Sequence, residues 1–481
     1  MSKLKALAGE TALYGFGSIV PRMLNFLLVP LYTHNVFSLE EYGSLTKLMA
    51  YVAFINVVFT FGMETAFFRF ANKAGGDAKR VFNLAQTCVF LVSISLSILF
   101  ISFASPLAAS FAIGNHPEFI TWLTLIMLTD AVVAIPFAQM RLEKKALQFA
   151  LVKIVNVVIL LALNLYFLKI AYDPAINIGY VFLANLIANS FFVLFFIKTL
   201  LAWRPTYDKE ISPAMLQYAY PVMLTGVAGM TNEMFSRTML DAWLPKNFYG
   251  TISNQAAGGI FGACYKFAVF MNLGIQAFRY AAEPFFFSNA TDKNSPALFA
   301  RVNHYFVIVA CVVFLGISIN LDVFQFIIGS NFRAGISIVP ILLLSYLLLG
   351  IYYNFSVWFK LTDKTFYGTI ITLVGAFVTI AGNYFLIPVM GYTGSSWAAL
   401  LCYGLMALLC YLLGQKYFPI PYQLSSMFGY LLITSGLVYF VNLFIIDTRW
   451  LSIAVHLFIV LIYLGIVYWI EKPRWKQSNV L

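Results

Sequence analysis

Five basic side chains lie inside long apolar stretches of the chain, where charge is costly. They are Arg22, Lys47, Lys153, Arg237 and Lys266. A charge at the centre of a bilayer costs about 2.5–3.5 kcal/mol on insertion scales, so such residues usually face a protein interior or a water-filled cavity. Arg22 and Lys266 fall near the middle of their stretches, and neither has an acidic residue within one helical turn. Guanidinium and ammonium groups at that depth could bind an anion.

The other three cations differ in how close they lie to the ends of their apolar stretches. Lys47 and Arg237 lie toward the ends of their stretches and stay in the candidate cationic site with Arg22 and Lys266. Lys153 lies close enough to one end for its long side chain to reach the interface, so we leave it out. The alternative interpretation is structural, because each cation could pair with a carboxylate from another helix.

Three carboxylates in or beside apolar stretches are candidates for coupling transport to an ion: Asp130, Glu64 and Glu233. Asp130 is isolated near the middle of its stretch, and an ion pair with a neighbouring helix is the alternative to coupling. Glu233 lies on one helical face with Arg237 and Asp241, at i, i+4 and i+8, so these charges could neutralise one another. Glu64 has a similar basic neighbour in Arg69.

The sequence contains no pattern that indicates a metal site, a cofactor site or an enzyme active site. The five cysteines and four histidines are scattered, without the spacing of a metal site or a redox pair, so we expect no metal and no cofactor. No P-loop, GxSxG or HExxH motif occurs, and we expect no enzyme activity.

Hydrophobic residues make up 61% and charged residues 10% of the chain. Soluble domains average roughly 45–50% and about 25%, so the composition excludes a soluble or nucleic-acid-binding protein.

The elements that must position these residues are membrane-spanning helices, each of about 20 mostly apolar residues. The 481 residues contain fourteen such stretches, near 11–32, 43–68, 82–104, 118–140, 147–170, 176–200, 213–242, 252–280, 303–328, 335–356, 366–388, 394–414, 426–446 and 450–470. With these spans, 21 of the 30 Lys and Arg residues fall in loops or at span ends on one side and 4 on the other. Cytoplasmic loops collect Lys and Arg, so we expect both termini in the cytoplasm. The excess of Lys and Arg in cytoplasmic loops also accounts for the net charge of +11.

A weak internal repeat divides these spans into two halves. Tyr42 and Tyr249 begin matching Tyr-Gly loops 207 residues apart, and Asn164 and Asn383 begin matching aromatic motifs 219 residues apart. Six spans in each half imply two lobes related by a pseudo-two-fold axis along the membrane normal. We therefore expect an all-α integral membrane protein with a lobe at 1–205, a second at 206–418, and two extra helices with a tail at 419–481. Chance similarity between apolar segments is the alternative.

The first and seventh spans also match in being interrupted by glycine and proline. Paired, broken helices in the two halves of a transporter indicate its substrate site and its moving parts. Gly and Pro are also common in membrane helices generally, which weakens this signal.

Short motifs along essentially the whole chain resemble the polysaccharide-export flippases of the multidrug, oligosaccharidyl-lipid and polysaccharide exporter superfamily. These motifs are Val29-Pro30-Leu31-Tyr32, Glu41-Tyr42-Gly43, Gly62-Met63-Glu64-Thr65-Ala66-Phe67-Phe68-Arg69-Phe70, and Asn383, Ile387-Pro388, Gly391 and Gly394. The resemblance implies a bacterial inner-membrane protein that moves an undecaprenyl-pyrophosphate-linked oligosaccharide, such as an O-antigen unit for lipopolysaccharide, outward by alternating access. It implies a cationic central cavity, in which Arg22, Lys47 and Lys266 look like the basic residues.

The resemblance also implies partners, namely the lipid-linked oligosaccharide, the bilayer and other polysaccharide assembly proteins.

Three alternatives to an oligosaccharide flippase stay open. A multidrug cation antiporter of the same superfamily relies on acidic cavity residues, which Arg22 in the first span disfavours. A lipid II flippase is closer to the first interpretation. A scaffold without transport activity would need neither broken helices nor cations at the midplane.

Overall fold

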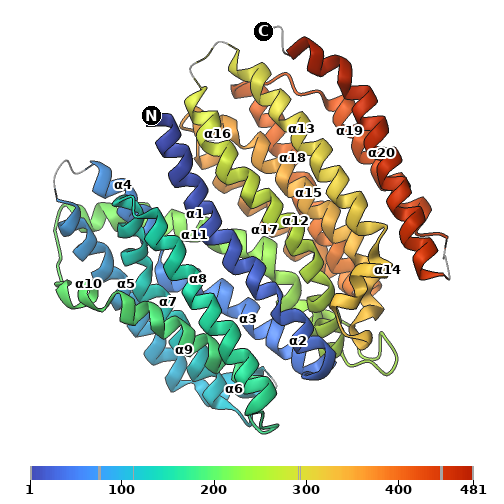
Figure 1. Ribbon diagram of the computed structural model, residues 1–481. Helices are drawn as coiled ribbons and strands as arrows, with labels where there is room; N and C mark the ends of the chain where they lie inside the picture. The colour runs from blue at the N-terminus through green and yellow to red at the C-terminus, as the bar shows by residue number, and fades with distance from the viewer. Residues whose placement is uncertain are drawn as a thin grey trace. The chain divides into compact units, whose positions relative to one another are not determined.

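The computed structural model describes residues 3–73, 77–111, 113–290, 292, 294–444 and 448–478. The described residues form helices joined by short loops and turns, with no β-strand (Figure 1). In the first half these are α1 (Lys3–Phe26), α2 (Leu28–Asn35), α3 (Leu39–Thr60), α4 (Met63–Lys73), α5 (Ala78–Ser102), α6 (Ala104–Ser110), α7 (Pro117–Leu142), α8 (Ala146–Leu165), the π-helix η1 (Tyr166–Ile170), α9 (Gly179–Phe195), α10 (Ile197–Ala202) and α11 (Ile211–Trp243).

The second half is helical in the same way. It contains α12 (Asn254–Ser288), α13 (Ser295–Ser318), α14 (Leu321–Phe324), the 3-10 helices η2 (Gln325–Ile327) and η3 (Ser330–Ile338), α15 (Val339–Phe355), α16 (Val357–Leu361), α17 (Phe366–Met390), α18 (Tyr392–Tyr417), α19 (Leu424–Val441) and α20 (Arg449–Ser478).

The multi-pass helical class is confirmed, whereas the count of fourteen spans stays a prediction. Every predicted span overlaps a helix, and eleven described helical segments are long and apolar enough to cross a membrane. The predicted spans 11–32, 176–200 and 213–242 are not among the eleven. The apolar helix α9 has only 17 residues, and α1 and α11 carry charged residues of the candidate site.

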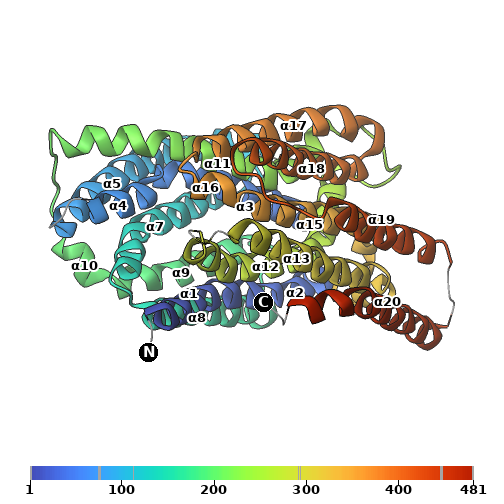
Figure 2. The ribbon, with the colours of Figure 1, turned by 90° about the horizontal axis from the view of Figure 1, so that it is seen from above.

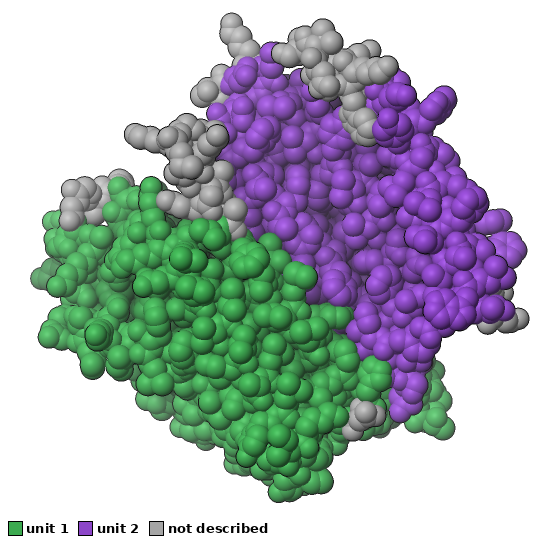
Figure 3. Space-filling model, in the orientation of Figure 1, with its two compact units in different colours: residues 1–262, 379–383 green, residues 263–378, 384–481 purple. Residues whose placement is uncertain are grey.

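The chain packs as two compact units, coloured separately in Figure 3. Unit 1 consists of residues 1–262 and 379–383, and unit 2 of residues 263–378 and 384–481. The predicted lobe boundaries at 205 and 418, and the lobe symmetry, stay predictions.

Helix α7 is the centre of unit 1, since α3, α5, α8 and α9 all pack on it. Helices α1 and α8 lie side by side in both views (Figure 1 and Figure 2). An apolar cluster that includes Phe59, Phe67, Val89 and Ile135 fills the space between α3, α4, α5 and α7. Lipid is as apolar as these side chains, so close van der Waals packing rather than escape from water holds them together. This packing fixes the polar residues of α7.

Local sequence signals set the ends of α3. Ser38 accepts a hydrogen bond from the Glu41 backbone, and the Glu41 carboxylate accepts one from the Ser38 backbone at 2.7 Å, which is a capping box. At the other end, Phe61 and Gly62 have positive φ values of 50° and 66°. The predicted span 43–68 lies within one apolar segment, Leu39–Asn72, which these two residues divide into α3 and α4. A side chain at Gly62 would also collide with the backbone of α11.

Unit 2 is organised around α15, which packs on α18 and α13. The Trp358 indole, just after α15, donates a hydrogen bond to the Cys410 carbonyl on α18 at 3.0 Å. The C-terminal helices are joined by a buried polar cluster, in which Glu471 of α20 accepts from Tyr430 of α19 at 2.7 Å and lies 3.1 Å from His304 of α13. A buried carboxylate needs such partners, so this cluster fixes how α19 and α20 pack on α13.

In unit 1, helices α3 and α12 approach so closely that only glycine fits at their contact. A Cβ on Gly43 would overlap the carbonyl of Gln255, and a Cβ on Gly259 would overlap the carbonyl of Leu39. Small residues at a membrane helix contact allow this approach. The neighbouring Gly258 differs, because a Cβ there would meet no described atom within 4 Å.

This contact predicts opposite outcomes for two glycine-to-alanine changes. Gly43→Ala should lower the free energy of unfolding by about 1–3 kcal/mol, since the added methyl forces the two backbones apart. Gly258→Ala should leave it unchanged or raise it by up to about 1 kcal/mol, because alanine favours helix and the space is open. Thermal unfolding of the purified variants in detergent measures both. Equal stabilities of the two variants would contradict the close contact.

Candidate functional site

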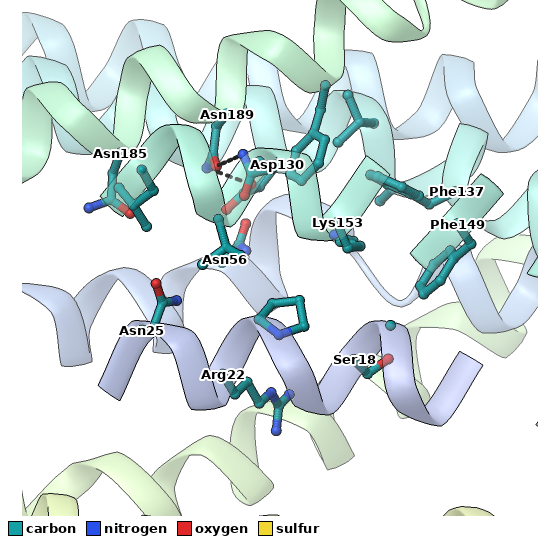
Figure 4. A pocket seen from close by; sticks show the side chains of 18 of the residues that line it. Ser18, Arg22, Asn25, Asn56, Asp130, Phe137, Phe149, Lys153, Asn185 and Asn189 are labelled. Carbon is teal, nitrogen blue, oxygen red and sulfur yellow. Dashed lines mark hydrogen bonds between the residues drawn. The ribbon is translucent and has the colours of Figure 1, made fainter. Parts of the chain in front are cut away.

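A cavity of about 520 Å³ lies within unit 1, among α1, α3, α4, α7, α8 and α9 (Figure 4). Polar side chains gather in it, although these helices are largely apolar elsewhere. They are Ser18, Arg22, Asn25, Asn56, Thr60, Glu64, Asp130, Arg141, Lys153, Asn156, Asn185 and Asn189. A cavity of this size and polarity can hold water and a polar ligand inside the hydrocarbon region.

Helix α1 forms one wall of the cavity. Ser18, Arg22 and Asn25 recur at i, i+4 and i+7, which places them on one helical face, and Pro21 lines the cavity beside them. The Arg22 side chain is exposed in the structure, so its guanidinium is accessible to a ligand. Figure 4 shows Asn25 and Ser18 on the side of this helix that faces the helices carrying Asp130 and Lys153, and the Arg22 guanidinium directed away from them.

Asp130 of α7 is held by one amide on the opposite wall. The Asn189 amide of α9 donates a hydrogen bond to the Asp130 carboxylate at 2.9 Å, drawn as a dashed line in Figure 4. The Asn156 amide of α8 donates to the Asn189 side chain at 3.4 Å and to the Ala188 carbonyl at 2.7 Å. Asp130 therefore receives an amide partner, and no described basic side chain lies within 4.0 Å of it. Asn56 has a buried side-chain oxygen with no hydrogen-bond partner in the described part of the chain.

Lys153 also lines the cavity, although its position near the end of its predicted span indicated that it would reach the interface. Its ammonium lies 4.1 Å from the ring centre of Phe137 and 4.5 Å from that of Phe192. Cation–π contacts stabilise a desolvated ammonium by about 2 kcal/mol. No carboxylate among the described residues lies within 4.0 Å of this nitrogen. The three-residue spacing of Lys153 and Asn156, and the four-residue spacing of Asn185 and Asn189, are the signals that could have identified this wall.

Glu64 and Arg141 form an ion pair at one end of the cavity. Arg141 also lies 5.0 Å from the Phe68 ring centre, and its Nε atom is buried without a partner among the described residues. The suggested pairing of Glu64 with Arg69 was wrong, since Arg69 instead lies 4.2 Å from the Tyr218 ring centre. Arg141 is eleven residues from Asp130 on α7, so the cavity extends along roughly 16 Å of that helix.

The other predicted site residues do not line this cavity. Lys47 of α3 forms an ion pair with Asp241 of α11 at 2.7 Å, with the two side chains 19% and 21% exposed. Glu233 and Arg237 lie half-buried one turn apart on α11, and Lys266 is half-buried in the part of α12 that belongs to unit 2. Arg22, Asp130 and Glu64 thus line one cavity, and the roles of all seven predicted site residues stay predictions.

Comparisons with solved structures identify the fold class. The structure of the lipid II flippase MurJ in its inward closed conformation matches with a TM-score of 0.73 and 14% identity, covering 95% of this chain and 98% of MurJ. An outward-facing multidrug resistance MATE family transporter of the MOP superfamily matches with a TM-score of 0.59 and 13% identity, covering 86% and 96%. The Vibrio cholerae MATE transporter VcmN, as a D35N mutant, matches with a TM-score of 0.56 and 16% identity, covering 86% and 98%.

The chain therefore has the fold shared by MurJ and the MATE transporters, as the sequence resemblance predicted. Identities of this size establish the fold alone. The sequence matches no protein-family model and no curated protein.

The Lys47–Asp241 ion pair predicts a strong energetic coupling between α3 and α11. Removing one partner from a largely buried pair leaves the other charge uncompensated, so Lys47→Ala or Asp241→Ala alone should cost about 3 kcal/mol. The double variant should cost less than the sum of the two, with an interaction energy of about 1–3 kcal/mol. Thermal or denaturant unfolding of the four proteins measures this cycle. Additive effects would mean that the two charges do not interact.

Proposed function

We propose that this protein is a flippase that moves a lipid-linked oligosaccharide, carried on undecaprenyl pyrophosphate, outward across the bacterial inner membrane by alternating access. The substrate class fits an O-antigen or another surface polysaccharide unit. The observation that carries the proposal is the unit 1 cavity, which places Arg22 and Lys153 inside a largely apolar helical framework.

Charge is the physical basis of the proposal. A pyrophosphate carries several negative charges, and moving it bare through hydrocarbon would cost a prohibitive free energy. Arg22 can bind phosphate oxygens bidentately, and Lys153 supplies a compact second cation. The amides of Asn25, Asn56 and Asn156 add polar groups beside them, while the lipid tail stays in the bilayer. Dispersed cations suit transport, because the substrate must also be released.

Two transport alternatives differ from this proposal in the ligand. A cation antiporter would attract positively charged drugs, but Arg22, Arg141 and Lys153 outnumber Asp130 and Glu64 in the cavity. A lipid II flippase must likewise bind an anionic lipid headgroup inside the membrane. The match to MurJ over 95% of this chain keeps it as the second candidate. Offering lipid II and a lipid-linked oligosaccharide as separate substrates distinguishes the two flippases.

The cavity cations predict a transport defect without a folding defect. Arg22→Ala and Lys153→Met should each slow flipping of a fluorescent undecaprenyl-pyrophosphate-linked oligosaccharide by about ten- to a hundredfold, since each removes a charge-assisted contact of roughly 1.5–3 kcal/mol. Arg22→Lys should keep part of the activity. Proteoliposomes containing the purified variants measure the rate, and Lys198→Ala, an exposed cation of α10 outside the cavity, is the matched control.

A well-folded Arg22→Ala/Lys153→Met double variant that flips at the wild-type rate would contradict the proposal. Loss of flipping together with a lowered unfolding temperature would instead assign these residues a structural role.

Asp130 is the proposed site of ion coupling, because it is a carboxylate inside the transport cavity whose described partner is the neutral amide of Asn189. Asp130→Asn should abolish the stimulation of flipping by a proton or sodium gradient, since the side chain can no longer gain and lose charge. Basal flipping without a gradient should stay within about threefold. Asn185→Ala, which changes the same cavity without touching Asp130, should keep the stimulation. Unchanged gradient dependence in Asp130→Asn would remove the coupling role.

A further inference from the structure

A second polar pocket lies in unit 1, away from the cavity described above, and no function is yet assigned to it. Its volume is about 270 Å³. Its polar lining comes from the start of α3, the loop before α7, the loop after η1 and the start of α12: Glu40, Glu41, Asn115, His116, Asn177 and Gln255. By the distribution of Lys and Arg, these segments belong to the side opposite the cytoplasm.

The frame of this pocket is fixed by hydrogen bonds. The Glu41 carboxylate accepts from the Ser38 backbone at 2.7 Å and from the Asn177 amide. The Gln255 amide donates to the Glu40 carbonyl at 3.2 Å, beside the close contact of α3 and α12. A pocket whose walls are fixed before binding loses little entropy when a ligand enters.

Hydrogen-bond acceptors predominate among the side chains that line the pocket. The Asn177 Nδ2 atom donates to Glu41, which leaves the Asn177 Oδ1 atom buried and without a partner among the described residues. The His116 Nδ1 atom lies 2.7 Å from the Glu118 carboxylate, which can only accept, so Nδ1 carries a hydrogen and Nε2 is the ring nitrogen left for a ligand. Glu40 adds a carboxylate whose Oε1 atom accepts from Ser253 at 3.0 Å.

The His116 ring also offers a flat surface. One of its faces stacks on Phe119, with ring centres 4.6 Å apart and an angle of 6° between the planes. The side chain is 36% exposed, so the ring remains accessible to a ligand. A supported aromatic ring beside several acceptors is suited to a ligand that has both an apolar face and many hydroxyl donors.

This combination argues against a metal ion, an anion and a lipid chain as the ligand. The described residues include no group of three or more His, Cys, Asp and Glu side chains placed to hold a metal ion. Carboxylates at Glu40 and Glu41 oppose an anion, and the polar lining opposes a lipid chain. We infer that this pocket binds a sugar ring of the substrate glycan on the outer side of the membrane. The inference rests on the proposed function for the origin of that glycan.

Binding of free sugars to the purified full-length protein in nanodiscs tests the pocket without any transport step. The probes are D-galactose, N-acetyl-D-glucosamine and L-rhamnose at millimolar concentration, with ethanolamine as an amine probe, detected by saturation-transfer NMR. His116→Ala and Asn177→Gly should each weaken sugar binding about tenfold. Glycine is chosen at Asn177 because φ is +47° there. His34→Ala, an exposed histidine outside the pocket, is the control and should bind normally.

Glu40→Gln separates a hydroxyl ligand from an amine. A glutamine oxygen still accepts from a hydroxyl, so sugar binding should stay within about threefold, whereas an ammonium ligand would lose its counter-charge. Binding of none of the three sugars, binding unaffected by His116→Ala and Asn177→Gly, or binding of ethanolamine alone would each overturn the inference. Unchanged unfolding temperatures of the variants exclude a folding defect.

The outcomes for the pocket and for the proposed function are distinguishable. A protein that flips the lipid-linked oligosaccharide but binds no sugar retains the proposed function and loses the pocket. A protein that binds sugars through His116 but flips no lipid retains the pocket and loses the proposed function.

Discussion

Every charged group in the hydrocarbon region needs a substitute for water, and unit 1 provides one for Lys153, Asp130, Arg141 and Glu64 of its cavity. Lys153 is held between two aromatic rings, Asp130 accepts from an amide, and Arg141 pairs with Glu64. These substitutes come from different helices, so the charges stay solvated only while the helices keep their packing. The stabilisation of buried charge therefore links α4, α7, α8 and α9 around the cavity.

The same constraint distinguishes charges that hold the fold from charges that are suited to a ligand. Lys47 and Asp241 neutralise each other across α3 and α11, which makes them part of the framework. Lys153 is stabilised by π-faces, which leave its positive charge available to an anion. Arg22 lies on an exposed face of α1 with other polar side chains. An anionic headgroup that enters the cavity would neutralise the positive charges of Arg22 and Lys153.

Much of the fold could be predicted from the sequence because apolar length alone identifies membrane helices. The break at Phe61–Gly62 could not, since hydropathy is continuous across it and only the backbone conformation reveals it. Arg22, Asp130 and Glu64 were identified individually by the cost of burying charge. Lys153 was missed because its position allowed it to reach the interface, and the contacts that hold it inside, with Phe137 and Phe192, depend on tertiary packing. The pairing of Lys47 with Asp241 joins residues far apart in sequence and was likewise hidden.

The most direct test of the central claim is whether the cavity recognises the charge of a lipid headgroup. Purified protein in nanodiscs would be titrated with undecaprenyl pyrophosphate and with undecaprenol, which has the same tail and no charge, while native mass spectrometry reports binding. The cavity predicts at least tenfold tighter binding of the pyrophosphate, and loss of that difference in Arg22→Ala/Lys153→Met. Equal binding of the two lipids, or a preference for the pyrophosphate that survives the double substitution, would contradict a cationic binding site.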